Sequence, residues 1–153
     1  MSFDLNNLRI GIVGLGYVGL PLAVELGKKY PTVGFDINTA RVAELEGGSD
    51  ATLECSSEEL AEATHLTYTS SVDAIANCNF YIVTVPTPID ESNRPVLTPL
   101  EDASIALGGA LKKGDIVVYE STVYPGATEE YGVPFLEKES GLTLNEDFFI
   151  GYS

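Results

Sequence analysis

The sequence predicts an α/β protein built around a doubly wound, mostly parallel sheet of six strands. Short β-branched runs recur along the 153 residues and are nearly continuous in apolar character, which is typical of strands buried on both faces. Helical patterns separate these runs, and strands that alternate with helices form parallel βαβ units. A glycine-rich turn, "GLGYVG", follows the first run. We therefore expect one layered domain spanning residues 1–153.

The strands are assigned in chain order from their apolar runs. They are "LRIGIV" at 8–13, "TVGFD" at 32–36, "HLTYT" at 65–69, "FYIVTV" at 80–85, "DIVVYE" at 115–120 and "DFFIGY" at 147–152.

Helices are predicted in the segments between the strands. The first runs from residue 17 to about residue 29, with Pro21 in its first turn and two lysines that complement the helix dipole at its end. The second begins after Asn38, a residue type that caps helix N-termini, and stops at Gly47-Gly48. Three more are predicted at 57–63, 99–111 and about 127–139.

Composition excludes several classes of partner. The formal net charge of −15 argues against nucleic acid, because binding to its backbone depends on Lys and Arg. No apolar run could span a bilayer, and the N-terminus lacks the basic segment of a secretory signal, so we expect a cytoplasmic protein with no membrane partner. Cys55 and Cys78 have no metal-ligand spacing and are expected to be free thiols, so no metal site is predicted.

The glycines of "GLGYVG" have the spacing of a phosphate-binding turn. The G-x-G-x-x-G pattern alone is weak, but here it leaves a strand and opens a helix, which is the context that its mechanism requires. Gly14 permits the tight turn, Gly16 lets a pyrophosphate approach the backbone, and Gly19 lets helix and strand pack closely. The helix N-terminus offers free N–H groups to the phosphates. This predicts a dinucleotide-binding Rossmann domain, with a turn that binds no ligand as the alternative.

The acid at the end of the second strand favours NAD as the dinucleotide. Asp36 follows Gly16 by about 20 residues, where a carboxylate accepts hydrogen bonds from the adenosine ribose hydroxyls and repels a 2′-phosphate. Arg41 lies close behind, and a nearby arginine is how many such sites accommodate NADP. With the acid present we expect NAD, and Arg41 either supports the same ribose or is a plain surface charge on the second helix.

Two further loops should flank the nicotinamide. Ligands of open α/β sheets lie beyond the carboxyl ends of the strands, where "VPTPID" and "YESTVYPG" follow the fourth and fifth runs. Pro86 and Pro88 fix φ on either side of Thr87 and would hold its hydroxyl in place. Ser121 and Thr122 offer hydroxyls on the other loop. Ordinary polar or proline-rich turns remain the alternative for both.

With these stretches assembled, the chain resembles the N-terminal domain of the UDP-glucose/GDP-mannose dehydrogenase family. The likeness covers nearly the whole chain and rests on "IGIVGLGYVGLPLA", "GFDIN", "VTVPTPID" with "LTPL", and "GDIVVYESTVYPGATEE". Within the family, "PTPIDESNRPVLTPL" and "YESTVYPGATEE" look most like bacterial enzymes that oxidise UDP-N-acetylhexosamines for surface polysaccharides.

The resemblance implies oxidation of a UDP-sugar C6 hydroxyl to a carboxylate with two NAD, through a cysteine thioester, by a homodimer or higher homo-oligomer. It places Val18, Asp36, Arg41, Thr87 and Thr122 around NAD and suggests that the Thr122 hydroxyl, as a catalytic group, positions a water. The remaining candidate cofactor contacts come from the loops that carry these motifs: Gly14, Gly16, Tyr17, Gly19, Pro86, Pro88 and Ser121.

The chain offers no nucleophile for this chemistry. Cys78 precedes the fourth strand at the end of the sheet opposite the ligand, and Cys55 lies in acidic surroundings that disfavour a thiolate. In the family, the central helix, the substrate domain and the catalytic cysteine follow the "GYS" at 151–153. We therefore expect an inactive NAD-binding fragment of a larger enzyme. A stand-alone NAD-binding protein and a domain of a hydroxy-acid dehydrogenase are the alternatives.

Overall fold

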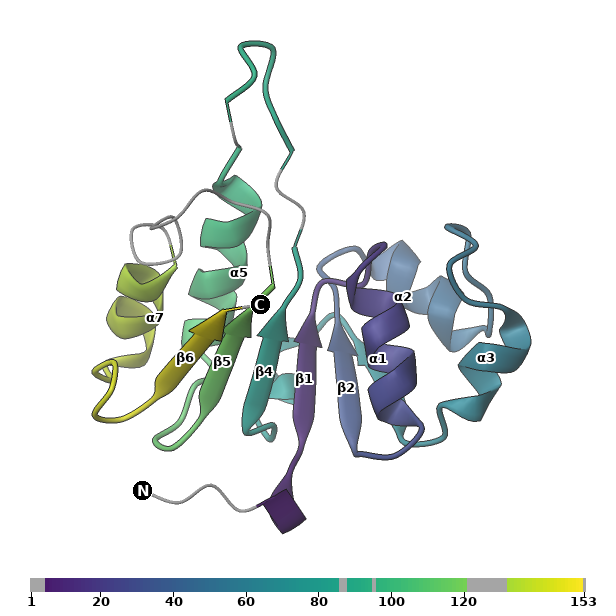
Figure 1. Cartoon of the computed structure of the whole chain (residues 1–153), viewed down its shortest axis with the longest axis horizontal. Coiled ribbons are helices and arrows are strands. Elements are labelled where there is room, and N and C mark those ends of the chain that lie inside the picture. Colours follow the sequence, from purple (N-terminus) through teal and green to yellow (C-terminus); the bar gives the residue numbers. More distant parts are fainter. Residues whose placement is uncertain (1–4, 86–87, 95, 121–131, 153) are drawn as a thin grey trace.

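The computed structural model describes residues 5–85, 88–94, 96–120 and 132–152 (Figure 1). Its centre is a six-stranded sheet in which all neighbouring strands run parallel, in the order β3-β2-β1-β4-β5-β6. The strands are β1 (Ile10–Val13), β2 (Thr32–Phe35), β3 (Leu66–Thr69), β4 (Phe80–Val83), β5 (Ile116–Tyr119) and β6 (Phe149–Tyr152). All six predicted strands are confirmed, and the sheet is parallel throughout where a mostly parallel one was expected.

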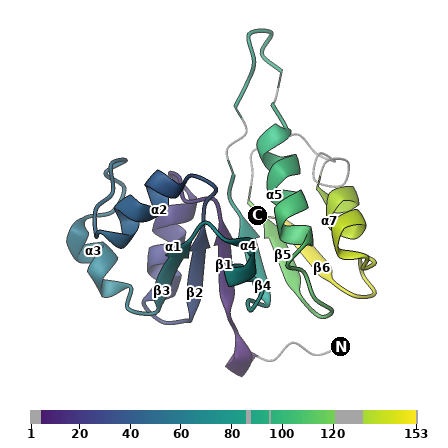
Figure 2. The same cartoon turned by 180° about the vertical axis from the view of Figure 1, so that it is seen from behind.

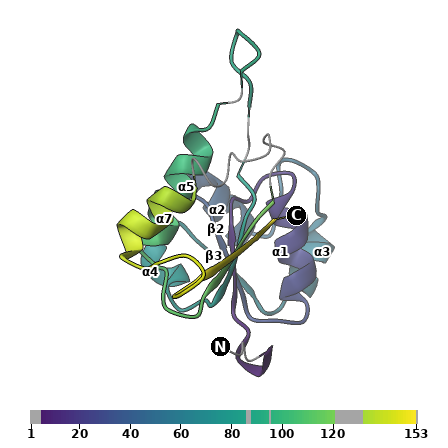
Figure 3. The same cartoon turned by 60° about the vertical axis from the view of Figure 1, so that its left-hand side comes forward.

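Helices cover both faces of the sheet. In the described residues they are η1 (Leu5–Asn7), α1 (Gly19–Gly27), α2 (Thr39–Glu46), α3 (Ser57–Glu62), α4 (Val72–Ile75), α5 (Thr98–Gly108) and α7 (Val133–Ser140). Viewed nearly along the sheet, α1 and α3 lie on one side and α4, α5 and α7 on the other (Figure 3). From behind, α5 and α7 are seen side by side (Figure 2). This two-sided covering is the doubly wound arrangement that the alternation of elements predicts.

The core divides into two apolar clusters, one on each face. Adjacent residues of one strand point to opposite faces, so Ile12 packs with α1 and α3 while Val13 packs with α4, α5 and α7. The side chain of Tyr81 is wholly buried in the second cluster, where its hydroxyl lies 2.8 Å from the carbonyl oxygen of Ile75. Burial on both faces explains why the strands read as continuous apolar runs.

The helix boundaries differ from the predictions where local signals are weak. The amide oxygen of Asn38 accepts from the backbone N–H of Ala40 and of Arg41, which confirms it as the N-cap of α2. α1 begins at Gly19, two residues later than expected. α4 was not predicted, because a single turn shows no periodicity. Of the helix expected at about 127–139, the part up to residue 131 lies outside the described residues, and α7 begins at Val133.

The strand order places a crevice above the carboxyl end of β1. The last residues of the strands are paired in register, so all strands end at one edge of the sheet. From β1 the chain builds outward to β2 and β3 on one side and to β4, β5 and β6 on the other. The connections that follow β1 and β4 therefore lead to opposite sides of the sheet. Open α/β sheets bind their ligands at such a point.

Candidate functional site

Gly14 begins the turn that leaves β1. Its φ of +102° lies in the region that favours glycine, and its N–H donates to the carbonyl of Phe35 at 2.8 Å. A Cβ at this position would lie 3.2 Å from the backbone of Thr84. The hydroxyl of Thr84 donates to the Gly14 carbonyl at 2.8 Å. The turn is thus fixed between β2 and the end of β4.

Gly19 and Gly16 have contrasting surroundings. A Cβ on Gly19 would lie 1.8 Å from the carbonyl oxygen of Gly14, so only glycine lets α1 pack this closely on the turn. A Cβ on Gly16 would meet nothing within 4 Å. The turn therefore leaves open space at Gly16, next to the start of α1, where the N–H of Leu20 donates to the Gly16 carbonyl at 3.1 Å. The N-terminus of a helix presents N–H groups that its own turns do not pair. This is the cradle that a pyrophosphate requires.

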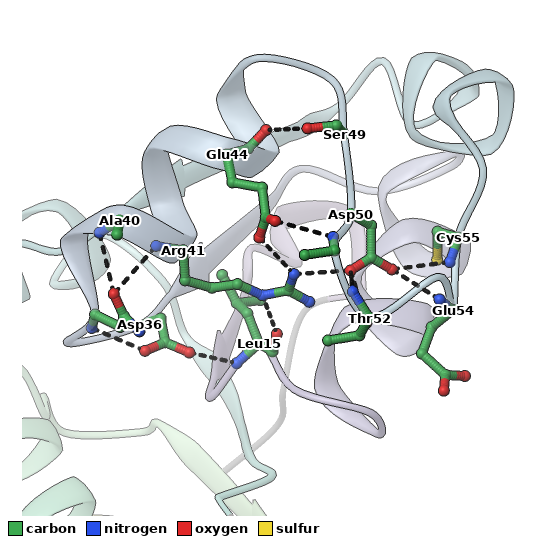
Figure 4. A network of polar contacts seen from close by, with 12 residues as sticks. Leu15, Asp36, Ala40, Arg41, Glu44, Ser49, Asp50, Thr52, Glu54 and Cys55 are labelled. Atoms are coloured by element: carbon green, nitrogen blue, oxygen red, sulfur yellow. Dashed lines mark hydrogen bonds and ion pairs between the residues drawn. The ribbon is translucent and has the colours of Figure 1, made fainter.

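Asp36 follows β2 and is oriented by backbone N–H groups of the glycine turn and of the turn after β2. One carboxylate oxygen accepts from the N–H of Leu15 at 3.0 Å and the other from the N–H of Asn38 at 2.9 Å (Figure 4). An ionised carboxylate has about four lone-pair sites, so two bonds leave acceptor capacity on each oxygen. The arrangement fits a carboxylate that receives two vicinal hydroxyls.

Arg41 is not the plain surface charge that was one expectation for it, because its side chain is only 10% exposed. Nε donates to the carbonyl of Leu15 at 2.9 Å, and Nη1 donates to Glu44 at 2.8 Å and to Asp50 at 2.7 Å (Figure 4). Burial lowers the pKa of Arg41, but the two carboxylates outweigh it and raise the pKa above the ordinary value. The guanidinium is therefore a permanent, internally paired charge.

A cavity of about 520 Å³ opens at the crevice between the glycine turn and α5. One wall comes from the ends of β1, β2 and β4 and the turns after them, and the other comes from α5 and the residue Val96 before it. The walls are mostly apolar, as suits the flat face of an adenine ring. The lining residues on the strand side are Val13, Gly14, Leu15, Gly16, Phe35, Asp36, Ile37, Thr84 and Val85, and those on the α5 side are Val96, Thr98, Pro99, Asp102, Ala103 and Ala106.

The other predicted site residues lie away from this cavity or outside the described residues. Tyr17 and Val18 are exposed, at 70% and 52%, and neither lines the cavity. The chain after β4 forms a hairpin that extends from the sheet (Figure 1), and across it the carbonyl of Pro88 accepts from the N–H of Val96 at 2.7 Å. The predicted contacts that lie outside the described residues are Pro86, Thr87, Ser121 and Thr122.

Sequence reasoning missed residues that complete the site. Thr84 anchors the glycine turn, and a polar residue ending an apolar strand was a signal for it. Asp102 comes from α5, far from the turn in sequence, where small and polar residues recur at helical spacing. Asp50 pairs with Arg41 from the connection after α2, and no local pattern marks it.

The described thiols do not form a nucleophilic site. Burial, together with the charges of Glu59 and other acids, raises the pKa of Cys55, and burial raises the pKa of Cys78 to about 11. Across the described ranges, no group of three or more His, Cys, Asp and Glu side chains is placed to hold a metal ion. None of the helices in the described part of the chain has the length and apolar character needed to cross a bilayer.

Comparison with known proteins connects this geometry to a family. The model of the UDP-glucose/GDP-mannose dehydrogenase family, NAD binding domain, matches residues 8–153. The chain belongs to this family. Membership removes the hydroxy-acid dehydrogenase alternative and makes NAD the dinucleotide of the domain. The glycine cradle, the oriented Asp36 and the cavity fit that cofactor.

Individual members of the UDP-glucose/GDP-mannose dehydrogenase family are similar over almost the whole chain. A UDP-N-acetyl-D-glucosamine 6-dehydrogenase of Pseudomonas aeruginosa is 62% identical over 97% of this chain and 35% of its own length. One of Salmonella typhi is 57% identical over 99% of this chain and 36% of its own length. The crystal structure of a ternary complex of GDP-mannose dehydrogenase from P. aeruginosa aligns with a TM-score of 0.84 at 26% identity, covering 95% of this chain and 35% of that one. The chain thus spans about a third of these relatives.

Proposed function

We propose that the chain is the NAD-binding part of a longer nucleotide-sugar 6-dehydrogenase. The parent would oxidise the C6 hydroxyl of a UDP-N-acetylhexosamine to a carboxylate and pass two hydrides to two NAD. The observation that carries the proposal is the crevice at β1, where an open glycine cradle and the oriented Asp36 frame one cavity. The substrate class is supported by the names of the relatives that are 62% and 57% identical.

We assign roles to the cofactor contacts according to their surroundings. Gly14, Gly16 and Gly19 shape the pyrophosphate cradle, and the carboxylate of Asp36 receives the adenosine ribose. The α5 wall of the cavity receives the adenine ring, because it is mostly apolar and lines the same cavity as the turn after β2. Thr122, which follows β5 in the sequence, remains our candidate for positioning a catalytic water. The nucleophile and the sugar pocket belong to the part of the parent that this chain does not include.

The wider setting of the parent follows from the same chemistry. NAD and UDP-sugars are cytoplasmic metabolites, and the thiols of Cys55 and Cys78 are free, as in a reducing compartment. We propose a bacterial cytoplasmic homo-oligomer that supplies a sugar acid for surface polysaccharides. The similarity to two bacterial 6-dehydrogenases supports this setting.

Calorimetric titration with NAD tests the site. The 153-residue chain should bind NAD, and Asp36→Asn should weaken binding by roughly 10- to 100-fold, because it removes hydrogen bonds to an ionised group. The chain should release no NADH when UDP-N-acetylglucosamine is added, because neither described thiol is activated.

Glu146→Gln is the matched control. It removes one exposed acid before β6, at the opposite edge of the sheet, and should leave NAD binding unchanged. Equal affinity of the Asp36→Asn variant and the unmodified chain would disprove the ribose role. Steady NADH production by the chain alone would disprove its assignment as a part without a nucleophile.

A further inference from the structure

One peptide plane of the glycine turn is held at both of its ends. The carbonyl of Gly14 and the N–H of Leu15 belong to the same trans peptide, so they point in opposite directions. The carbonyl accepts from the hydroxyl of Thr84 at 2.8 Å, and the N–H donates to the carboxylate of Asp36 at 3.0 Å (Figure 4). Thr84 follows β4 and Asp36 follows β2, so this plane connects residues on both sides of β1.

The hydroxyl of Thr84 is committed to the Gly14 end of this plane. A hydroxyl has one proton to donate. Oγ1 of Thr84 lies 3.2 Å from the carbonyl of Val13, but that carbonyl already accepts from the N–H of Thr84 at 2.9 Å. Within the described part of the chain, no backbone N–H donates to the carbonyl of Gly14. The hydroxyl therefore supplies the hydrogen bond that this carbonyl would otherwise lack.

The plane depends on such a donor because its own residue does not fix it. Gly14 has no Cβ, so rotation about its backbone bonds meets little steric hindrance. Close packing shows where the fixed carbonyl lies: a Cβ on Gly19 would be 1.8 Å from the Gly14 oxygen and 2.4 Å from Oγ1 of Thr84. The carbonyl is thus held against the start of α1. As a result, the N–H of Leu15 is directed at Asp36.

We propose that Thr84 is a positioning residue for Asp36. By fixing the peptide plane between Gly14 and Leu15, its hydroxyl keeps the N–H of Leu15 on one carboxylate oxygen and so keeps the carboxylate oriented for the ribose. Thr84 is only 6% exposed, and in this role it acts through the plane, without a hydrogen bond of its own to the cofactor. This inference rests on the proposed function, because it requires the adenosine ribose to lie at Asp36.

Calorimetric titration of the 153-residue chain with NAD measures the effect of removing the hydroxyl. Thr84→Val keeps the branched shape of the side chain but leaves the carbonyl of Gly14 without a donor. The dissociation constant of NAD should rise about fivefold, which corresponds to one ordinary hydrogen bond. Thr84→Ser retains a hydroxyl and should restore most of the affinity that Thr84→Val loses.

Thr32 provides a matched control for the loss of a buried hydroxyl. Its side chain is 2% exposed, and its hydroxyl also donates to a backbone carbonyl, that of Tyr30, at 2.9 Å. Thr32 begins β2, at the opposite end of that strand from Asp36. Thr32→Val should lower the midpoint of thermal unfolding, as Thr84→Val does, but should leave NAD affinity unchanged. An equal loss of affinity in both variants would mean that reduced stability is the cause, and would overturn the inference.

A double-mutant cycle tests whether Thr84 acts through Asp36. In Asp36→Ala the N–H of Leu15 has already lost its acceptor. Adding Thr84→Val should therefore weaken NAD binding by less than about twofold more, because coupled residues are not additive. The NMR resonance of the Leu15 amide proton gives a second readout, without cofactor. It should move upfield in Thr84→Val, because its hydrogen bond to the carboxylate weakens, and should stay in place in Thr32→Val.

The outcomes of these measurements are distinct. Equal losses of affinity from Thr84→Val in the two backgrounds, or an unmoved Leu15 resonance in the folded variant, would overturn the inference. If Thr84→Val does not fold by circular dichroism, Thr84→Ala takes its place with the same expected results. Failure of the unmodified chain to bind NAD would instead overturn the proposed function, and the Leu15 resonance would still test the link between Thr84 and Asp36.

Discussion

Asp50 shows how a single buried carboxylate can organise a loop. One oxygen accepts from Arg41, from the N–H of Thr52 and from the Thr52 hydroxyl, and the other accepts from the N–H of Glu54 and of Cys55. Burial raises the pKa of Asp50, but the hydrogen bonds from Thr52, Arg41 and the backbone outweigh it and hold the pKa well below its ordinary value. The folded chain therefore favours the ionised form.

Lowering the pH should reveal how much the ionised carboxylate of Asp50 contributes to the free energy of unfolding. Because the pKa of Asp50 is lower in the folded than in the unfolded chain, its stabilisation is complete above the ordinary value of 3.8 and is lost as pH falls below it. We expect Asp50→Asn to lower the free energy of unfolding at pH 6 by about 3 kcal/mol, since it leaves Arg41 without its buried partner. Urea unfolding measures this between pH 6 and pH 3. The free energies of unfolding of the Asp50→Asn variant and the unmodified chain should differ less at pH 3 than at pH 6.

Glu46→Gln, which changes an exposed acid on α2, is the control. Its difference in free energy of unfolding from the unmodified chain should not shrink between pH 6 and pH 3. A difference between Asp50→Asn and the unmodified chain that stays constant down to pH 3 would contradict the pKa direction.

At the scale of elements, termini fixed by side chains make short helices possible. α3 has only six residues, which is too short for a helix to be stable by itself. Ser56 accepts from the N–H of Glu59 through its hydroxyl, and the carboxylate of Glu59 accepts from the N–H of Ser56, both at 3.1 Å. This capping box and the buried Leu60 hold α3 against α1.

Removing the cap should have a measurable cost. We expect Ser56→Ala to lower the free energy of unfolding by about 1 kcal/mol, because an N–H at the start of α3 loses its acceptor. Chemical denaturation at neutral pH measures the change. Ser92→Ala alters an exposed serine of the hairpin after β4 and should have no effect, and equal stability of the two variants would show that the box contributes nothing.

At the scale of the whole molecule, repulsion among acidic side chains destabilises the folded state. The net charge of −15 is carried by 153 residues, in which 23 Asp and Glu outnumber 8 Lys and Arg. Like charges on a compact surface repel one another and destabilise the folded state. The paired groups around Arg41 are buried and are screened much less than the surface.

Salt should therefore stabilise the protein. Raising NaCl from about 10 mM to about 150 mM shortens the Debye length from about 30 Å to about 8 Å, so the free energy of unfolding should rise. Thermal denaturation at pH 7 measures this change, and the midpoint temperature should rise with the salt concentration. KCl should give the same rise if screening is the cause. A falling midpoint in both salts would mean that attractive pairs dominate the surface.

Much of the fold was predictable because it is encoded locally. The strands follow from continuous apolar runs, and α2 follows from Asn38 at its start and Gly47 at its end. The packing of Gly19 on the turn follows from the glycine spacing. Each of these features depends on residues within one or two turns of chain, so the sequence carries its signal directly.

By itself, then, the sequence determined the order of the elements and the position of the glycine turn and Asp36. Only the tertiary structure decided the direction of Arg41 and the walls of the cavity. Asp50 meets Arg41 because the connection after α2 folds back. Asp102 lines the same cavity as the glycine turn because α5 packs in one apolar cluster with residues of β1 and β4. Such partners are set by how crossovers stack elements in space, and hydrophobic periodicity does not record that information.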